Sequence, residues 1–246
     1  MKVTRIPIAM LHHVSNRSDW ESLKPFVVCE ETFLRFLNAI QAAGKHPTTF
    51  EEICQGNAPS NPIIITVDDC GKHLFDFVIP ELTRRNMKAV FFSPTAHLGD
   101  CNAWDVAEGR SRVELMDSRD LKALSQLGME IGGHSHHHVH LGRMEHEAVL
   151  NELVESRAII QNITGKAPVS MAYPFGSIPE NAEEIMAQAG YTYACGIFCP
   201  KAAEFSLRRF IVHDGDSAAS IRFKLSGAHA VYRAWTDSHK PESAFR

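Results

Sequence analysis

The sequence predicts an α/β protein built on a parallel sheet, and three observations carry this prediction. Seven short runs of β-forming residues alternate with helical patterns, which favours parallel strands joined by right-handed crossovers. Ile63–Val67, directly after Pro62, is an unbroken run of β-branched residues, typical of a strand buried on both faces. Histidines and aspartates follow the ends of several runs. A barrel and a doubly wound sheet both fit this pattern.

The predicted strands and helices follow one another along the whole chain. Apolar residues recur at helical spacing between the strands, glycine follows several of these segments, and Pro80 indicates a kink or break in one of them. The segments Gln55–Pro62 and Gly99–Ser111 are predicted as loops. The strands are Ile6–Leu11, Ile63–Val67, Ala89–Phe92, Met129–Gly132, Val169–Ala172, Thr192–Cys195 and Phe210–Val212. The helices are Thr32–Ala43, Leu74–Asn86, Ser118–Leu127, Glu145–Asn162, Pro179–Ala189 and Ser220–Leu225.

Length and composition suit one soluble domain over residues 1–246, with a polar C-terminal tail from about residue 236. The 246 residues are 44% hydrophobic and carry a formal net charge of -4, which argues against a nucleic-acid partner. No apolar run approaches the roughly 20 residues of a membrane span, and the first residues lack the pattern of a signal peptide. We therefore expect a cytoplasmic protein with reduced cysteines.

Two polar clusters suggest a catalytic site. Asp68 and Asp69 follow the Ile63–Val67 run, and five histidines fall between His134 and His140. Two histidines and one carboxylate form a common catalytic zinc set. His134 and His138 are suitably spaced, but His136 and His140 have the same spacing, so spacing alone leaves both pairs open.

The placement of these residues favours the catalytic interpretation. His12, Asp68, His134, Pro174 and His213 each lie just after, or within a few residues of, a predicted strand end. In a parallel barrel these ends share one face, which carries the active site. We therefore expect residues far apart in the sequence to meet in one pocket.

Three segments resemble the motifs of the NodB-like polysaccharide deacetylases, carbohydrate esterase family four. Thr66-Val67-Asp68-Asp69 resembles the first motif, and His134-Ser135-x-x-His138 the second. Ala172-Tyr173-Pro174-Phe175-Gly176 resembles a variant of the third. The likeness covers roughly residues 6–210 and implies a distorted seven-stranded (β/α) barrel.

The resemblance also implies roles for individual residues. Asp68 is the expected general base, and Asp69, His134 and His138 are the expected ligands of Zn²⁺ or of Co²⁺, Ni²⁺ or Fe²⁺. The backbone N–H of Phe175 is expected to stabilise the oxyanion. The third-motif residues expected to surround the substrate and oxyanion are Tyr173, Pro174, Phe175 and Gly176.

The sequence departs from the family pattern at several places. Cys70 replaces a glycine, and Ala172 replaces an arginine that orients the base, for which Arg208 and Arg209 are candidate substitutes. The fourth motif is absent. The general acid is expected to be His213, in an Ile-Val-His segment, or His12. Trp104 and Asp105 are expected in a loop, as a sugar-stacking wall or as simple packing.

The expected function is removal of N-acetyl groups from an amino sugar of a cell-surface polysaccharide or its precursor, O-antigen biosynthesis being one setting. The expected partner is an N-acetylated sugar. Two alternatives stay open: hydrolysis of a non-sugar C–N amide by the same fold, and a degenerate barrel without catalysis. The sequence leaves the exact sugar, the native metal and the oligomeric state undetermined.

Overall fold

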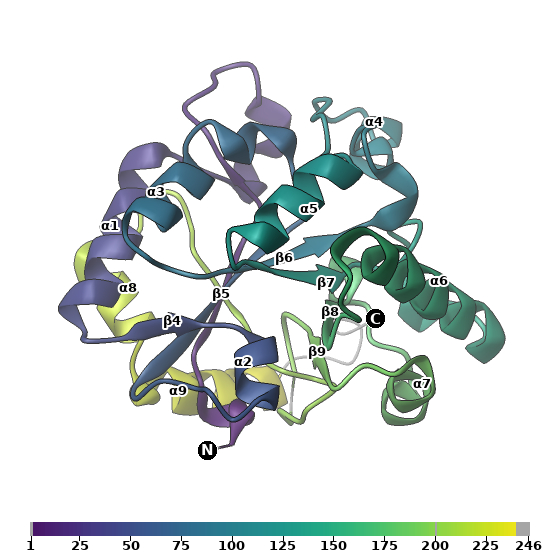
Figure 1. Cartoon of the computed structure of the whole chain (residues 1–246). Helices are drawn as coiled ribbons and strands as arrows, with labels where there is room; N and C mark the ends of the chain where they lie inside the picture. The colour runs from purple at the N-terminus through teal and green to yellow at the C-terminus, as the bar shows by residue number, and fades with distance from the viewer. Residues whose placement is uncertain (1, 200, 240–246) are drawn as a thin grey trace.

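The computed structural model, which describes residues 2–199 and 201–239, joins the seven predicted strands in one curled parallel sheet (Figure 1). The strand order is β10-β1-β5-β6-β7-β8-β9, and every neighbouring pair in this path runs parallel. The strands are β1 (Ile8–Leu11), β5 (Pro62–Asp68), β6 (Val90–Ser93), β7 (Glu130–Gly133), β8 (Ser170–Ala172), β9 (Tyr193–Cys195) and β10 (Phe210–Ile211).

The two edges of the sheet approach each other just before β10. Cys195 and Leu207 form a parallel bridge. The Leu207 N–H donates to the Ala194 carbonyl (2.8 Å), and the Gly196 N–H donates to the Leu207 carbonyl (2.9 Å). The sheet therefore curls into the distorted seven-stranded barrel that was predicted. One further strand, β4 (His46–Thr48), pairs in parallel with the start of β5 and was not predicted.

Alternation along β5 decides which side chains face the barrel interior. Ile63, Ile65 and Val67 belong to the outer core beneath the helices, whereas Ile64 belongs to a separate cluster with Val90, Phe92 and other interior residues. Because side chains alternate along a strand, Thr66 and Asp68 share the face of Ile64. Asp68 therefore points into the barrel at its carboxyl end.

Helices surround the sheet at the six places where they were predicted (Figure 1). The segment predicted as one helix from Leu74 to Asn86 is divided into a 3₁₀ turn (Lys72–Phe75) and α3 (Val78–Arg84). The break precedes Pro80 and leaves it in the first turn of α3, where its missing N–H is not needed. The other helices are α1 (Glu30–Ala42), α5 (Ser118–Gln126), α6 (His146–Thr164), α7 (Ala182–Ala189) and α8 (Ala218–Lys224).

Several short elements near the barrel ends were not predicted. The predicted loop 99–111 contains α4 (Ala103–Ala107), so that loop prediction was partly wrong. Helix α9 (Gly227–Ser238) extends past the predicted start of the polar tail, of which residues 240–246 lie outside the described part. None of the described helices has the length and apolarity to cross a bilayer. Further short elements, besides 3₁₀ turns, are α2 (Phe50–Cys54) and the parallel pair β2 (His13–Val14) and β3 (Val27–Val28).

Candidate active site

Three buried side chains converge at the carboxyl ends of β5 and β7. The Nε2 atoms of His134 and His138 lie 3.4 Å and 3.3 Å from Oδ1 of Asp69, and the three possible ligand atoms all lie within 4.8 Å of one another. Within the described chain, Oδ1 of Asp69 is buried without a hydrogen-bond partner. A buried, unpaired carboxylate oxygen facing two ring nitrogens fits a bound divalent cation.

The two histidines are oriented by different contacts. Nδ1 of His134 donates to the carbonyl of Ala172 on β8 (2.8 Å), which leaves the lone pair on Nε2, facing Asp69. His138 has no such bond, because its Nδ1 is buried without a partner among the described residues. Its ring instead stacks on Trp104 from α4, with centroids 3.7 Å apart and planes at 18°. Aromatic packing therefore orients the second histidine.

The structure also separates the two histidine pairs that spacing left open. Nδ1 of His136 lies 2.8 Å from the hydroxyl of Thr95, and the ring of His140 stacks on Phe175 with centroids 4.0 Å apart. Among the described residues, only His134 and His138 join Asp69 in a group of potential ligands.

Asp68 is held by the guanidinium of Arg209 inside the barrel. Nη1 donates to Oδ1 of Asp68 (2.6 Å), Nη2 donates to Oδ2 (2.9 Å), and Nη1 also donates to the hydroxyl of Thr66 (3.1 Å). Asp68 and Arg209 are almost completely buried. Arg209 thus provides the cation missing at Ala172, whereas Arg208 pairs with Asp237 on α9.

Opposing effects set the ionisation of the two aspartates. Burial raises the pKa of each carboxyl, but the charge of Arg209 holds the pKa of Asp68 below its usual value. Contacts with His134 and His138 hold the pKa of Asp69 well below its usual value, again against burial. Both carboxylates are therefore ionised near neutral pH.

Backbone strain is concentrated at this site. Seven described non-glycine residues have positive φ angles, and five of them lie in the three motif segments. An L-residue in this conformation costs roughly 1–2 kcal/mol, and such strain commonly marks functional positions. The five are Asp69 (69°), Cys70 (54°), Ser135 (54°), His138 (54°) and Phe175 (59°).

A cavity of about 330 Å³ opens above these residues. His12 lines it, with Nε2 3.9 Å from Oδ2 of Asp68. His213 does not line it: its side chain is exposed, and its backbone N–H donates to Asp216 in a turn after β10. Of the two candidate acids, the structure therefore brings only His12 to the aspartates.

Aromatic rings form the wall of the cavity. Trp104 covers His138, Phe175 packs against His138 and His140, and Phe26 lies 5.3 Å from the ring of His12. Trp104 therefore lies in the site, on a helix and not in the expected loop. Three further lining residues that were not predicted are His13, Glu108 and Arg110, of which Arg110 pairs with Asp105 (2.6 Å).

The third-motif segment contributes an unpaired backbone N–H as well as the ring of Phe175. The hydroxyl of Tyr173 donates to the carbonyl of Phe205 (2.8 Å) and is committed to the fold. The N–H of Phe175 makes no hydrogen bond to the described residues, and this residue lines the cavity. Pro174 and Gly176 shape the turn without lining the cavity. An unpaired N–H is therefore available for a substrate oxygen.

Cys70 packs beside the site as a neutral thiol. It is buried in the outer core, and its sulfur donates to the carbonyl of Phe92 (3.3 Å). Burial raises its thiol pKa well above the usual value, and the charges of Asp69 and Asp68 add to this effect. The geometry fits a packing role for this side chain.

Comparison with known proteins agrees with this geometry. A family model described as polysaccharide deacetylase matches residues 55–194, more than half of the chain. The fold resembles that of the Streptococcus pyogenes deacetylase PplD, solved with acetate, with a TM-score of 0.75 and 19% identity over 90% of this chain and 98% of that one. It also resembles IcaB from Ammonifex degensii, with a TM-score of 0.70 and 17% identity over 93% and 97% of the two chains.

Two proteins with related sequences are also named as deacetylases. The YxkH protein of Bacillus subtilis, whose name places it with the polysaccharide deacetylases, is 23% identical over 89% of this chain and 76% of its own length. A poly-beta-1,6-N-acetyl-D-glucosamine N-deacetylase of Staphylococcus aureus is 20% identical over 71% of this chain. The match spans 62% of that relative's own length. With its fold and family match, the chain belongs to the polysaccharide deacetylase family of hydrolases.

Proposed function

We propose that this chain is a metal-dependent N-deacetylase acting on an N-acetylated amino sugar of a surface polysaccharide or its precursor. The observation that carries the proposal is the placement of two differently held carboxylates in one cavity. Asp69 faces the Nε2 atoms of His134 and His138, while Asp68 is bound by Arg209. The two carboxylates can therefore take different roles, with Asp69 as a metal ligand and Asp68 as the base.

Asp69, His134 and His138 would hold Zn²⁺ or a similar divalent ion such as Co²⁺, Ni²⁺ or Fe²⁺. When bound, such an ion polarises the amide carbonyl and increases the acidity of water. Two imidazole nitrogens and one carboxylate suit these ions better than they suit Mg²⁺ or Ca²⁺, which prefer all-oxygen sites.

The remaining residues supply the proton transfers. Asp68 accepts a proton from the water whose oxygen attacks the acetyl carbon, since each of its oxygens retains a lone pair beside the Arg209 bond. The N–H of Phe175 stabilises the resulting oxyanion. His12 donates a proton to the sugar nitrogen as the C–N bond breaks. The products are acetate and a free amine.

The cavity and the relatives favour a sugar substrate. Trp104 and Phe175 expose ring surface at the cavity, as expected for packing against a sugar ring. The staphylococcal relative is named for a β-1,6-linked N-acetylglucosamine polymer, so we propose this linkage as the first substrate class. An O-antigen precursor is the second class to compare. Arg209 binds Asp68, as the arginine missing at residue 172 was expected to do, and this weakens one reason to propose a non-sugar amide.

Acetate release from β-1,6-linked N-acetylglucosamine oligosaccharides tests the proposal. We expect release by the wild-type protein, loss with a chelator and recovery with Zn²⁺ or Co²⁺. Asp68→Asn should retain bound metal and lose at least about 10²-fold in activity, whereas His134→Ala should lose both. His137→Ala is the matched control, because this exposed histidine of the same tract pairs with Glu152 outside the cavity. Equal activity of all four proteins would disprove the mechanism.

A further inference from the structure

The two histidines of the proposed metal site are held by unequal contacts. Nδ1 of His134 donates to the carbonyl of Ala172 (2.8 Å), and this bond fixes the orientation of the ring. Nδ1 of His138 is buried and has no hydrogen-bond partner among the described residues. The backbone of His138 also has a φ of 54°, a conformation that L-residues rarely adopt. The position of the His138 ring therefore depends on the side chains that pack against it.

Trp104 makes the closest ring contact to His138 in the described chain. The two ring centroids lie 3.7 Å apart, and the ring planes are inclined by only 18°. Phe175 and His134 meet the His138 ring edge-on instead, at 4.7 Å and 74° and at 4.9 Å and 70°. Because the indole covers one face of the imidazole, rotation of the His138 ring about its Cβ–Cγ bond would drive ring atoms into Trp104. Trp104 therefore fixes the plane of this ring.

The helix that carries Trp104 depends on other contacts for its position. Helix α4 (Ala103–Ala107) has five residues, and a helix of this length is not stable by itself. The indole of Trp104 also meets the ring of His97, with centroids 5.3 Å apart. The orientation of Trp104 is therefore set by the side chains around α4.

Asp105, the residue after Trp104, anchors α4 to the following loop. Its carboxylate is buried and accepts from Nη1 of Arg110 (2.6 Å) and from Nδ2 of Asn102 (3.1 Å). The carbonyl of Asp105 also accepts from the Arg110 N–H (2.9 Å). Asn102 is itself buried and bonds to the Ser111 carbonyl (3.1 Å) and the Val113 N–H (2.7 Å). These bonds close the loop around α4 and hold Trp104 against His138.

We propose that Trp104 is a positioning residue for His138, and that the Asp105–Arg110 ion pair keeps Trp104 in place. This inference rests on the proposed metal site. A ligating imidazole usually donates its second ring N–H to an oxygen acceptor, which orients it. Stacking on Trp104 takes this role for His138, since its Nδ1 has no partner in the described chain. Metal affinity then depends on a segment that contributes no ligand.

The test measures the dissociation constant for Zn²⁺ by competition with a chromogenic chelator. The full-length protein is used without substrate, so packing of Trp104 against a sugar cannot produce the effect. Trp104→Leu removes the flat ring and should lose at least about tenfold in affinity, as when the partner that orients a ligating histidine is removed. Trp104→Phe keeps an aromatic ring and should stay within about threefold of the wild type.

Asp105→Asn tests the ion pair without changing the aromatic ring. The asparagine removes the charge that binds Arg110 and keeps the backbone bond between the two residues. We expect a loss of Zn²⁺ affinity that is smaller than the loss in Trp104→Leu. If Trp104→Leu does not fold, this variant and Trp104→Phe still decide the outcome: equal affinity of Asp105→Asn and the wild type would overturn the role of the ion pair.

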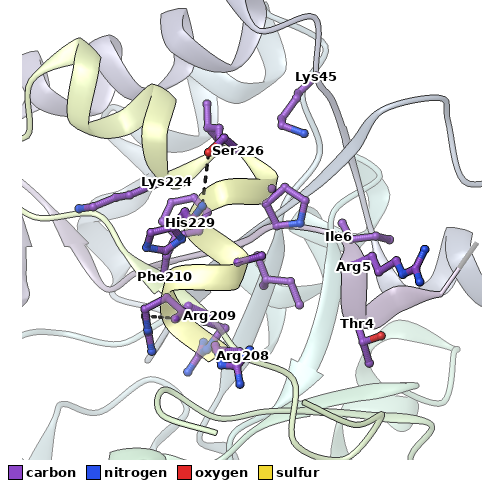
Figure 2. A pocket seen from close by; sticks show the side chains of 16 residues that line it. Thr4, Arg5, Ile6, Lys45, Arg208, Arg209, Phe210, Lys224, Ser226 and His229 are labelled. Carbon is purple, nitrogen blue, oxygen red and sulfur yellow. Dashed lines mark hydrogen bonds between the residues drawn. The ribbon is translucent and has the colours of Figure 1, made fainter. Parts of the chain in front are cut away.

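Trp235→Leu is the matched control, because it makes the same substitution outside the active-site cavity. Trp235 is 62% exposed on α9. The start of this helix, with Ser226 and His229, lines a separate pocket at the amino end of the barrel (Figure 2). Trp235→Leu should keep the Zn²⁺ affinity of the wild type, which separates the effect at Trp104 from a general effect of removing an indole.

The visible absorption spectrum of the Co²⁺-loaded protein gives a readout that is independent of affinity. The spectrum responds to the arrangement of the ligands around the ion, which a merely structural role of Trp104 would not change. We expect altered band intensities in Trp104→Leu. Trp104→Phe and Trp235→Leu should both give the spectrum of the wild type.

The outcomes distinguish this inference from the proposed function. An unchanged Zn²⁺ affinity and Co²⁺ spectrum in Trp104→Leu would overturn the inference and leave the proposed function intact. An equal loss of affinity in Trp104→Leu and Trp104→Phe would also overturn it, because an aromatic ring would then not be sufficient. A wild-type protein that binds no metal would overturn both, whereas one that binds metal and releases no acetate would contradict the proposed function alone.

Discussion

The two ends of the barrel bury carboxyl groups whose pKa values are shifted in opposite directions. At the carboxyl end, Asp68 and Asp69 are buried beside Arg209 and two histidines, and the pKa of each lies below its usual value. At the amino end, Glu130 is equally buried but accepts from uncharged donors, among them the Ser170 hydroxyl (2.5 Å) and the Glu51 N–H (2.9 Å). Burial raises its pKa to about 7. Burial therefore does not decide the charge of a carboxyl; the presence of a cationic partner does.

The largest effect is expected from removing Arg209, the cation at the carboxyl end of the barrel. Arg209→Met should leave Asp68 buried without its guanidinium partner, which costs about 3–5 kcal/mol of stability. Because the charge of Arg209 lowers the pKa of Asp68, its loss should raise that pKa. The acidic limb of the kcat/KM profile should then move to higher pH, with activity reduced about 10²-fold or more.

The double variant Asp68→Asn/Arg209→Met is the control. It should recover much of the lost stability, since neither charge stays buried alone, and it should stay inactive. An Arg209→Met protein with an unchanged pH profile would show that Arg209 is structural and does not position the base.

Much of this arrangement follows from sequence patterns. The β-branched runs identify the seven strands, and strand ends bring Asp68, Asp69, His134 and His138 to one face. The alternation of side chains along the last strand could also have identified Arg209, and not Arg208, as the partner of Asp68. Phe210 and Val212 pack in the outer core, so alternation turns Arg209 inward, where it lines the active-site cavity with Ile211.

The differences between the sequence predictions and the structure lie where tertiary contacts decide the local conformation. The His213 prediction rested on its place in an Ile-Val-His segment directly after a strand predicted to end at Val212, but β10 ends at Ile211 and a turn follows. Strand β4 is short and contains Pro47, so it carries little β signal. Helix α9 depends on Asp237, which is buried against Arg208 and Arg233, and local propensity does not reveal those contacts.

The next prediction concerns the amino end. The folded-state pKa of Glu130 is about 7, above its ordinary value of 4.5, so the folded protein binds more protons between these values. Its contribution to stability is present below about pH 4.5 and is lost as the pH rises through about 7. The loss amounts to at most about 3 kcal/mol. Glu130→Gln, which cannot ionise, should remove this slope.

Urea unfolding of the wild type and Glu130→Gln at pH 5, 6, 7 and 8 measures the effect. The two free energies should diverge as the pH rises, in favour of the glutamine variant. If the unfolding free energies of the two proteins changed in parallel with pH, the Glu130 carboxyl would keep the same charge in the folded and unfolded protein. The pKa of this carboxyl would then not be raised at the amino end of the barrel.

The third prediction separates the two candidate acids. His12→Gln should reduce kcat about 10²-fold and leave bound metal unchanged, because His12 lines the cavity 3.9 Å from Asp68 without belonging to the ligand group. His213→Gln should keep activity within about twofold, since its side chain is exposed outside the cavity. The reverse result would assign the proton to His213 and require the turn after β10 to move.

The smallest expected effect concerns Cys70, a neutral thiol that lies next to the two charged aspartates. Its φ of 54° favours glycine, the residue usual in the family. Cys70→Gly relieves this strain but loses the buried sulfur and adds chain entropy to the unfolded state, so the net change should stay within about 1 kcal/mol. Cys70→Ala keeps the strain and also loses the sulfur, so it should be the less stable of the two in urea unfolding. Both should retain metal and acetate release, because a neutral thiol contributes neither a ligand nor a proton at this site; loss of metal in either would show that Cys70 supports Asp69 directly.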